Sequence, residues 1–107
     1  MSRKARSDRN HIIYELKLAE QFYIGVTYVQ DGKLQKSLVR RWQKHIRRAL
    51  TEDKNWVLCK AIRKHGPEAF EISILEVVRG KALAHTRERE WIHMYNPPLN
   101  TDKRKAV

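Results

Sequence analysis

The stretch "NHIIYELKLAEQFYIGVTY" (residues 10–28) decides the fold. Apolar and polar side chains alternate over residues 10–18 and again over residues 21–28, which is the pattern of two half-buried strands. Only two residues separate these strands, so the chain is expected to turn back on itself as an antiparallel hairpin. Tyr14 lies in the first strand and Tyr23 in the second. Aromatic residues fill half-buried strands in general, so the two phenols belong either to a core or to a shared site.

A polar loop over residues 29–37 separates the hairpin from the first predicted helix. Asp31-Gly32 is a turn signal inside this loop, and Ser37 is a candidate N-cap. The helix is expected over residues 37–50, because its apolar side chains recur at helical spacing. Its expected core-facing residues are Leu38, Trp42, Ile46, Ala49 and Leu50.

Two further helices and one further strand complete the expected order β-β-α-α-β-α. Asp53 is a candidate cap for the second helix, which "HGP" (65–67) ends because proline cannot continue a helix. A third strand is expected over residues 68–78 and a last helix over about 80–95, before Asn96-Pro97-Pro98. The expected core-facing residues of the second helix are Val57, Leu58, Ala61 and Ile62, and one face of the third strand is expected to hold Phe70, Ile72, Ile74 and Glu76.

The length of 107 residues is enough for one domain with a single modest core. Its expected parts are a basic N-terminal arm (1–10), a folded domain (11–101) and a basic C-terminal tail (102–107). The single cysteine, Cys59, excludes an internal disulfide and is typical of a reducing compartment. The sequence has no apolar run long enough to span a membrane, so we expect a soluble, cytoplasmic protein.

The net charge of +11 is concentrated in the two ends and in the first predicted helix. Residues 36–50 contain six lysines and arginines and no carboxylate. This distribution is typical of a protein that binds a polyanion, most simply nucleic acid. The alternative is a solvated basic surface, which accounts for charged ends better than for a helix without an acid. The residues of this helix that are expected to contact phosphates are Arg40, Lys44, Arg47 and Arg48.

One acidic residue interrupts the apolar stripe of the last helix. The stripe consists of Ala84, Glu88, Trp91 and Tyr95, at helical spacing. A buried carboxylate without a partner is costly, so Glu88 is expected to hold a cation or a metal ion. The alternative places Glu88 at the rim of the stripe, in water and paired with Arg87 or Arg89. On the first helix, Arg41 and His45 flank the apolar face and can line a cleft at the edge of the core.

Several segments carry the same resemblance in the same order. They are "IIY" (12–14), "YIG" (23–25), "VRRWQKH" (39–45), "KHGPEAFEISILE" (64–76), "REREWI" (87–92) and "PPLN" (97–100). Their order and spacing resemble the GIY-YIG nucleases over nearly the whole chain. Ile12 stands where the family has the glycine of its first motif. The resemblance implies an α/β (α+β) fold, with a three-stranded antiparallel sheet flanked by helices.

The same resemblance implies an endonuclease that hydrolyses DNA phosphodiester bonds with one Mg²⁺ or Mn²⁺ ion per active site. The site residues that it implies are Tyr14 and Tyr23 as the paired tyrosines, Arg41 on the scissile phosphate, His45 beside it, Glu88 as the metal ligand and Asn100 as a supporting residue. The two phenols are expected to face one side, opposite Arg41 and Glu88. A nearby cation can lower the pKa of a phenol, so Tyr14 is a candidate general base and His45 is its rival.

Two alternatives stay open at this point. A nuclease-like module could bind nucleic acid without cutting it, although the presence of all the expected site residues favours an enzyme. RNA is an alternative ligand, because a basic helix contacts phosphates without distinguishing the sugars. The sequence gives no indication of the oligomeric state.

Overall fold

The computed structural model describes residues 9–52 and 56–100. Most of the expected arm, the expected cap Asp53 and the expected tail lie outside the described residues. Asn10, the last residue of the expected arm, is also the first residue of the first strand, as expected for that strand. The elements are β1 (Asn10–Leu18), β2 (Gln21–Tyr28), α1 (Leu34–Thr51), α2 (Val57–His65), a short 3₁₀ helix (Pro67–Ala69), β3 (Glu71–Arg79) and α3 (Lys81–Tyr95).

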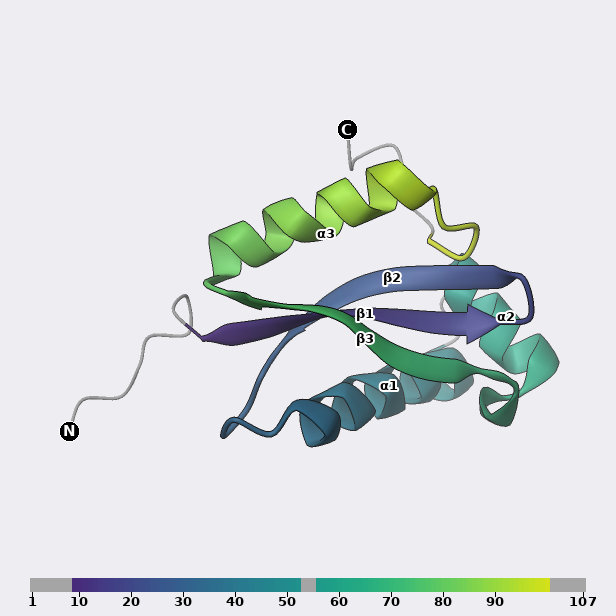
Figure 1. The fold of residues 1–107 in the computed structure, drawn as a ribbon. Helices are drawn as coiled ribbons and strands as arrows, with labels where there is room; N and C mark the ends of the chain where they lie inside the picture. The colour runs from purple at the N-terminus through teal and green to yellow at the C-terminus, as the bar shows by residue number, and fades with distance from the viewer. Residues whose placement is uncertain (1–8, 53–55, 101–107) are drawn as a thin grey trace.

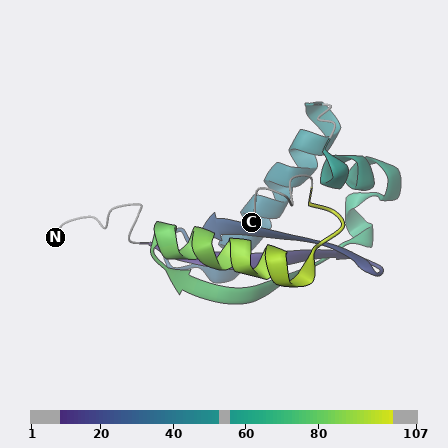
Figure 2. The same cartoon turned by 90° about the horizontal axis from the view of Figure 1, so that it is seen from above.

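The three strands form one antiparallel sheet in the order β2-β1-β3. β1 is the central strand, and its continuous apolar run at residues 12–14 lets it bury side chains on both faces. Helices α1 and α2 cover one face of the sheet, and α3 covers the other (Figure 1). Seen from above, α3 lies along the strands, whereas α1 is inclined to them (Figure 2). The expected fold class, sheet and element order are therefore confirmed.

Strand register places both tyrosines on the face that α1 covers. Tyr14 lies opposite Gly25 on β2, and Tyr23 lies opposite Leu16 on β1. Residues two positions apart share a face, so Tyr14, Leu16, Tyr23 and Gly25 all face α1. Tyr14 is fully buried in the core cluster on this side, and Tyr23 packs against that cluster.

A bulge changes the faces of β3. Ile13 pairs with Glu76 and Tyr14 pairs with Ile74, so Leu75 is an extra residue on β3. Glu76 therefore points toward α3, where its carboxylate accepts hydrogen bonds from Arg87 Nε (3.1 Å) and Trp91 Nε1 (2.9 Å). The expectation that Glu76 shares a face with Ile74 is wrong, because simple alternation does not anticipate the extra residue.

The start of α1 also differs from the expected one. The helix begins at Leu34, with Lys33 in the N-cap position, so Ser37 is not its cap. Instead the Ser37 hydroxyl lies inside the first turn, where it donates to Lys33 O (2.7 Å) and accepts from Gln30 N (2.9 Å). Ser37 thus holds the loop against the helix.

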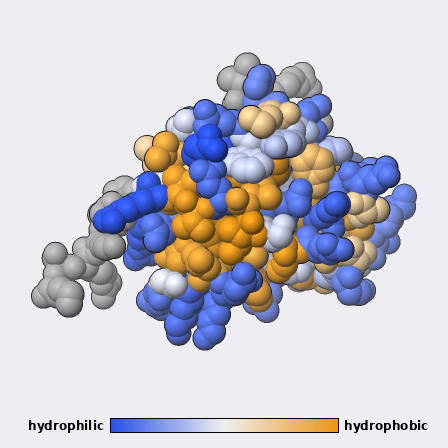
Figure 3. All heavy atoms as spheres, viewed as in Figure 1, coloured by the Kyte–Doolittle hydropathy of each residue, from blue (hydrophilic) through white to orange (hydrophobic). Residues whose placement is uncertain are grey.

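Three of the expected core positions are exposed. Leu50 is 61% exposed at the end of α1, Val57 is 40% exposed at the start of α2, and Tyr95 is 51% exposed at the end of α3. Each lies in an end turn of its helix, and the Tyr95 ring stacks on that of Trp91, with 5.3 Å between the ring centroids. An apolar area also remains uncovered on the side shown in Figure 3. Val77 of β3 and Leu83 of α3 are among the exposed large apolar side chains.

Candidate active site

A row of hydrogen bonds joins Arg41, Tyr14 and His45. Arg41 Nε donates to the Tyr14 hydroxyl (3.2 Å), and the same hydroxyl lies 2.7 Å from His45 Nε2. Arg41 and His45 are one helical turn apart on α1, so both reach the phenol from the same side. Both contacts of the Tyr14 hydroxyl are hydrogen bonds when it accepts from Arg41 and donates to His45 Nε2, with the ring proton of His45 on Nδ1.

Tyr23 completes the aromatic part of the site. Its ring centroid lies 6.2 Å from that of Tyr14 and 5.2 Å from that of His45, with the edge of one ring toward the other in the second pair. Both phenols pack on Gly25: a β-carbon there would lie 2.5 Å from the Tyr14 hydroxyl oxygen and 2.8 Å from Tyr23 Cε1. The glycine of "YIG" is thus required because the two tyrosine rings occupy the space of a side chain.

Burial sets the protonation of these groups. It raises the pKa of Tyr14 well above its usual value, and Arg41 opposes this rise without cancelling it. The expected lowering of the Tyr14 pKa by a nearby cation is therefore outweighed in the folded protein. Burial, with Arg41 and then Arg48 beside it, lowers the pKa of His45 to about 3. His45 is thus neutral at pH 7 and can accept a proton.

Glu88 reaches the same environment from the opposite layer. It lies on α3, and its side chain is 21% exposed, at the rim of the helix stripe rather than in the core. Burial raises the pKa of Glu88, whereas the charges of Arg41 and Arg89 oppose the rise. Its carboxylate also lies 3.7 Å from His85 Nδ1. Arg41 and Glu88 both act on the pKa of Tyr23, so the site groups from both layers share one electrostatic environment beside β2.

Asn100 supports the site by holding the backbone of β2. Its side-chain oxygen accepts from Ile24 N (2.9 Å), and its side-chain nitrogen donates to Ile24 O (2.8 Å). Leu99 N donates to Phe22 O (3.0 Å), so the segment after α3 runs along the outer edge of β2. Ile24 lies between Tyr23 and Gly25, so this clamp fixes the position of the tyrosine motif. Both polar atoms of the Asn100 side chain are used in it.

Glu88 is suited to hold a hydrated divalent ion. Among the described residues, no group of three or more His, Cys, Asp or Glu side chains is arranged to hold a metal. Mg²⁺ typically keeps several waters and binds through one or two carboxylates together with substrate phosphates. Glu88 is a single, partly exposed carboxylate that forms no salt bridge with a lysine or arginine in residues 9–52 and 56–100, and it meets that requirement.

The four basic residues expected on phosphates have different surroundings. Arg40 and Lys44 line a small cavity beside Arg41, and Arg47 is exposed on α1. The guanidinium of Arg48 lies over the Trp56 ring, 5.7 Å from its centroid. Arg40, Lys44 and Arg47 therefore present their charges to solvent more fully than Arg48 does.

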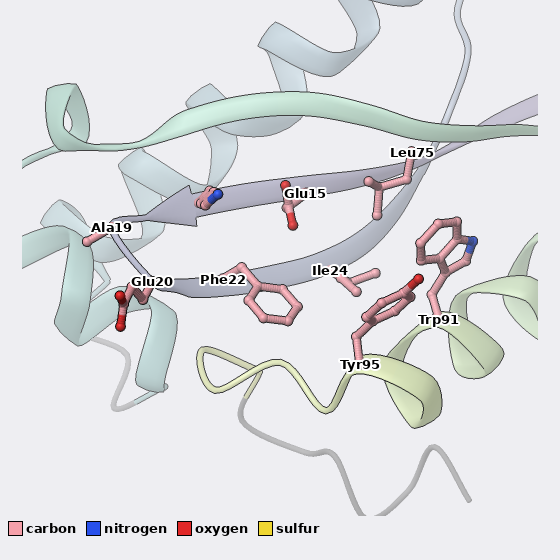
Figure 4. A pocket seen from close by; sticks show the side chains of 9 residues that line it. Glu15, Ala19, Glu20, Phe22, Ile24, Leu75, Trp91 and Tyr95 are labelled. Atoms are coloured by element: carbon pink, nitrogen blue, oxygen red, sulfur yellow. The ribbon is translucent and has the colours of Figure 1, made fainter.

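A larger pocket, of about 540 Å³, lies on the other face of the sheet near the β1–β2 turn (Figure 4). Phe22, Ile24, Trp91 and Tyr95 form much of its wall, and the Glu15 side chain points into it. None of the expected site residues lines this pocket. The tyrosine site and the pocket are therefore separate.

Sequence reasoning missed two features near the site. Glu76 ties β3 to α3 through Arg87 and Trp91, which lie on either side of Glu88 in the sequence. No sequence signal pointed to this contact, because the bulge that creates it is not visible in the alternation. Thr27, which lines the cavity beside Arg41, was also missed, although its spacing from Gly25 on β2 could have indicated it.

Comparison with solved structures places this arrangement in a known fold. The chain is similar to the catalytic domain of the intron endonuclease I-TevI, in a variant with one glutamate replaced by alanine. The sequence identity is 27% and the TM-score is 0.65, and the match covers 85% of this chain and 89% of that chain. No family model and no curated protein matches the chain. Within the described residues, no helix is long and apolar enough to cross a membrane.

The structural match and the motifs agree. I-TevI is a GIY-YIG intron endonuclease, and the match covers 85% of the chain. This similarity supports a nuclease-like function and a nucleic-acid substrate. The chain therefore has the fold of a GIY-YIG nuclease catalytic domain, and the resemblance to that family is confirmed.

Proposed function

We propose that the chain is a divalent-metal-dependent endonuclease that hydrolyses phosphodiester bonds in DNA. The observation that carries the proposal is the hydrogen-bonded row of Arg41, Tyr14 and His45 within the electrostatic reach of Glu88. Phosphodiester hydrolysis needs an activated water, a cation on the phosphate and help for the leaving oxygen. Each requirement has a matching group in this site.

Arg41 binds the scissile phosphate in this mechanism. Only its Nε is used within the described residues, so its two terminal nitrogens can donate to a non-bridging oxygen. Tyr14 has no exposed surface, and Arg41 covers one side of its hydroxyl. When Arg41 moves onto a phosphate, that side of the hydroxyl opens to the attacking water.

Tyr14 and His45 move the proton. The Tyr14 oxygen takes a proton from the attacking water while its own proton passes to His45 Nε2 over the 2.7 Å hydrogen bond. The resulting hydroxide forms the new P–O bond as the bond to the leaving oxygen breaks. The negative charge of the bound phosphate raises the pKa of His45 from its resting value of about 3, which favours this transfer.

Glu88 would hold the divalent ion, with waters and substrate oxygens as the remaining ligands. When bound, the ion would supply positive charge to the phosphate and the leaving oxygen. Asn100 keeps β2 in place, so that Tyr23 and Gly25 stay packed against the reacting phenol.

The full burial of Tyr14 favours one competing function, a module that binds nucleic acid without cutting it. The two functions are separated by incubating the purified chain with supercoiled plasmid and synthetic branched DNA, with Mg²⁺ and with excess chelator. The enzyme cuts at least one substrate only when Mg²⁺ is present. The module binds both DNAs and leaves them intact under all conditions. A parallel RNA substrate tests whether the sugar matters.

A further inference from the structure

A small, strongly cationic cavity lies next to the tyrosine site. It has a volume of about 90 Å³ and lies between the end of β2 and the first half of α1. The residues that line it are Thr27, Tyr28, Ser37, Arg40, Arg41 and Lys44. Three of the six are cations and none is a carboxylate, so the lining attracts an anion.

The cations around this cavity are not engaged elsewhere in the described part of the chain. Arg40 and Lys44 make no hydrogen bond or salt bridge there. Arg41 uses only Nε, on the Tyr14 hydroxyl, and its terminal nitrogens make no hydrogen bond within residues 9–52 and 56–100. Donors of this kind that share a cavity without a carboxylate match the oxygen atoms of a phosphate group.

The Thr27 hydroxyl of the cavity can serve a ligand. The Ser37 hydroxyl is already satisfied by Lys33 O and Gln30 N. The Tyr28 ring lies under the guanidinium of Arg9, 5.4 Å from its centroid. The Thr27 hydroxyl makes no hydrogen bond within the described residues. Thr27 is therefore available as a neutral donor at the β2 wall.

The cavity lies at a fixed offset from the proposed catalytic phenol. Tyr23, Gly25 and Thr27 alternate along the same face of β2, and the Tyr14 hydroxyl packs on Gly25. Thr27 is two residues further along the strand, which corresponds to roughly 7 Å. Arg41 belongs to both places, because it binds Tyr14 through Nε and lines the cavity.

We propose that this cavity binds a second, uncut phosphate of the same nucleic-acid strand, close to the scissile phosphate. Arg40, Lys44 and the Thr27 hydroxyl hold that phosphate, and Arg41 lies between it and the reacting one. Thr27 is then a positioning residue that sets the register of the strand against Tyr14. This inference rests on the proposed function. It predicts that bonds at the strand end, where this phosphate is missing, are poor substrates.

The test uses a DNA that the wild-type chain cuts at a mapped position. One methylphosphonate, which removes the charge of a single phosphate, is placed in turn at the positions flanking the cut. At one position within two nucleotides of the cut, the methylphosphonate is expected to weaken DNA binding about tenfold in the absence of metal. This factor corresponds to the loss of one hydrogen bond to a charged group. Thr27→Val is expected to weaken binding of unmodified DNA by a similar factor.

The decisive result is the combination of the two changes. If Thr27 contacts the neutralised phosphate, the methylphosphonate at that position lowers the DNA affinity of Thr27→Val only slightly, because the contact is already lost in this variant. Thr27→Ser keeps the hydroxyl and restores most of the affinity. Thr86→Val is the matched control, because Thr86 lies on α3 and its hydroxyl donates to Ala82 O. The proposal is overturned if Thr27→Val and the methylphosphonate each lower DNA affinity by their full factor when combined. It is also overturned if Thr27→Val binds unmodified DNA as tightly as the wild type does.

A second measurement separates this proposal from the proposed function. Inorganic phosphate is titrated into the metal-free wild-type chain and into Thr27→Val, and backbone amide shifts are followed by NMR. A saturable shift at Thr27 that is lost in the variant supports the anion site even if no DNA is cut. DNA cleavage without such a shift, and without a sensitive flanking phosphate, overturns the anion site and leaves the endonuclease intact.

Discussion

Replacing Tyr14 with phenylalanine removes one hydroxyl and keeps the ring that packs on Gly25. The hydroxyl lies between Arg41 and His45, so the change deletes both contacts of the row at once. Arg41 is partly exposed and can bind water instead, whereas His45 is buried and its Nε2 is left without a donor. Leaving one buried polar group unsatisfied costs about 1–3 kcal/mol of unfolding free energy.

The effect of Tyr14→Phe on the reaction is expected to be much larger than its effect on the fold. Loss of a general base slows a chemical step on the order of 10²–10⁴-fold. The assay is single-turnover DNA cleavage in Mg²⁺ at saturating protein, below the melting transition of the variant, with DNA affinity measured in parallel. Affinity is expected to change little, because Tyr14 has no exposed surface for the substrate to contact.

Tyr95→Phe is the control for this prediction, because it removes a phenol hydroxyl from an exposed ring on α3. His45→Ala tests the rival base in the same assay. The proposed proton relay predicts that Tyr14→Phe and His45→Ala both cleave DNA slowly in single-turnover conditions. A full single-turnover rate for Tyr14→Phe refutes the reasoning, and a large loss in His45→Ala alone transfers the role of base to the histidine.

The remaining predictions use the other contacts of the site. Gly25→Ala is expected to cost about 1–3 kcal/mol in urea denaturation and to slow cleavage, because its β-carbon overlaps the two phenols; wild-type stability would contradict this. Unfolding free energy is expected to fall as pH falls from about 6.5 toward about 3, because His45 takes up a proton in the unfolded chain over that range but not in the folded chain. Denaturation measured across this pH range should show a smaller dependence of unfolding free energy on pH for His45→Gln, and an unchanged dependence would contradict the assignment. Glu88→Gln is expected to raise the melting temperature in metal-free buffer at pH 7, since burial raises the pKa of Glu88 and disfavours its charge; a lower melting temperature contradicts this. Lys44→Ala is expected to reduce the magnitude of the slope of log affinity against log salt by roughly one unit, and an unchanged slope places Lys44 off the DNA.

The hairpin could be predicted to the residue because its determinants are local. Alternation fixes the faces of β1 and β2, and a two-residue connection fixes their pairing. Ser37 was misread because a serine at the start of an apolar periodicity is typical of a cap, whereas here its hydroxyl holds a loop inside the first turn. Glu76 was assigned to the wrong face because a bulge on β3 reverses the alternation without leaving a mark in the sequence.

The identities of the expected site residues came from the sequence, but their electrostatics did not. The sequence placed Arg41 near Tyr14 and predicted a lowered phenol pKa from charge alone. The folded chain buries Tyr14 completely, and desolvation outweighs the neighbouring cation. Glu88 likewise is partly exposed and lies near His85, not in a salt bridge with Arg87 or Arg89 among the described residues, yet it is buried enough for its pKa to rise. The balance between desolvation and neighbouring charges depends on how the helices of both layers pack on the sheet. The spacing of residues in the sequence does not predict that packing.

The central claim is that this site hydrolyses DNA with a divalent ion held by Glu88. The most direct measurement is the initial rate of plasmid or branched-DNA cleavage in Mg²⁺ for the wild type, Glu88→Gln and the control Glu90→Gln. Glu90 lies on the same helix, is exposed and pairs with Arg87, so its change alters charge equally without touching the site. The account predicts cleavage by the wild type and Glu90→Gln, abolished by chelator, with DNA bound but uncut by Glu88→Gln. Cleavage by Glu88→Gln at a rate close to that of the wild type would contradict it.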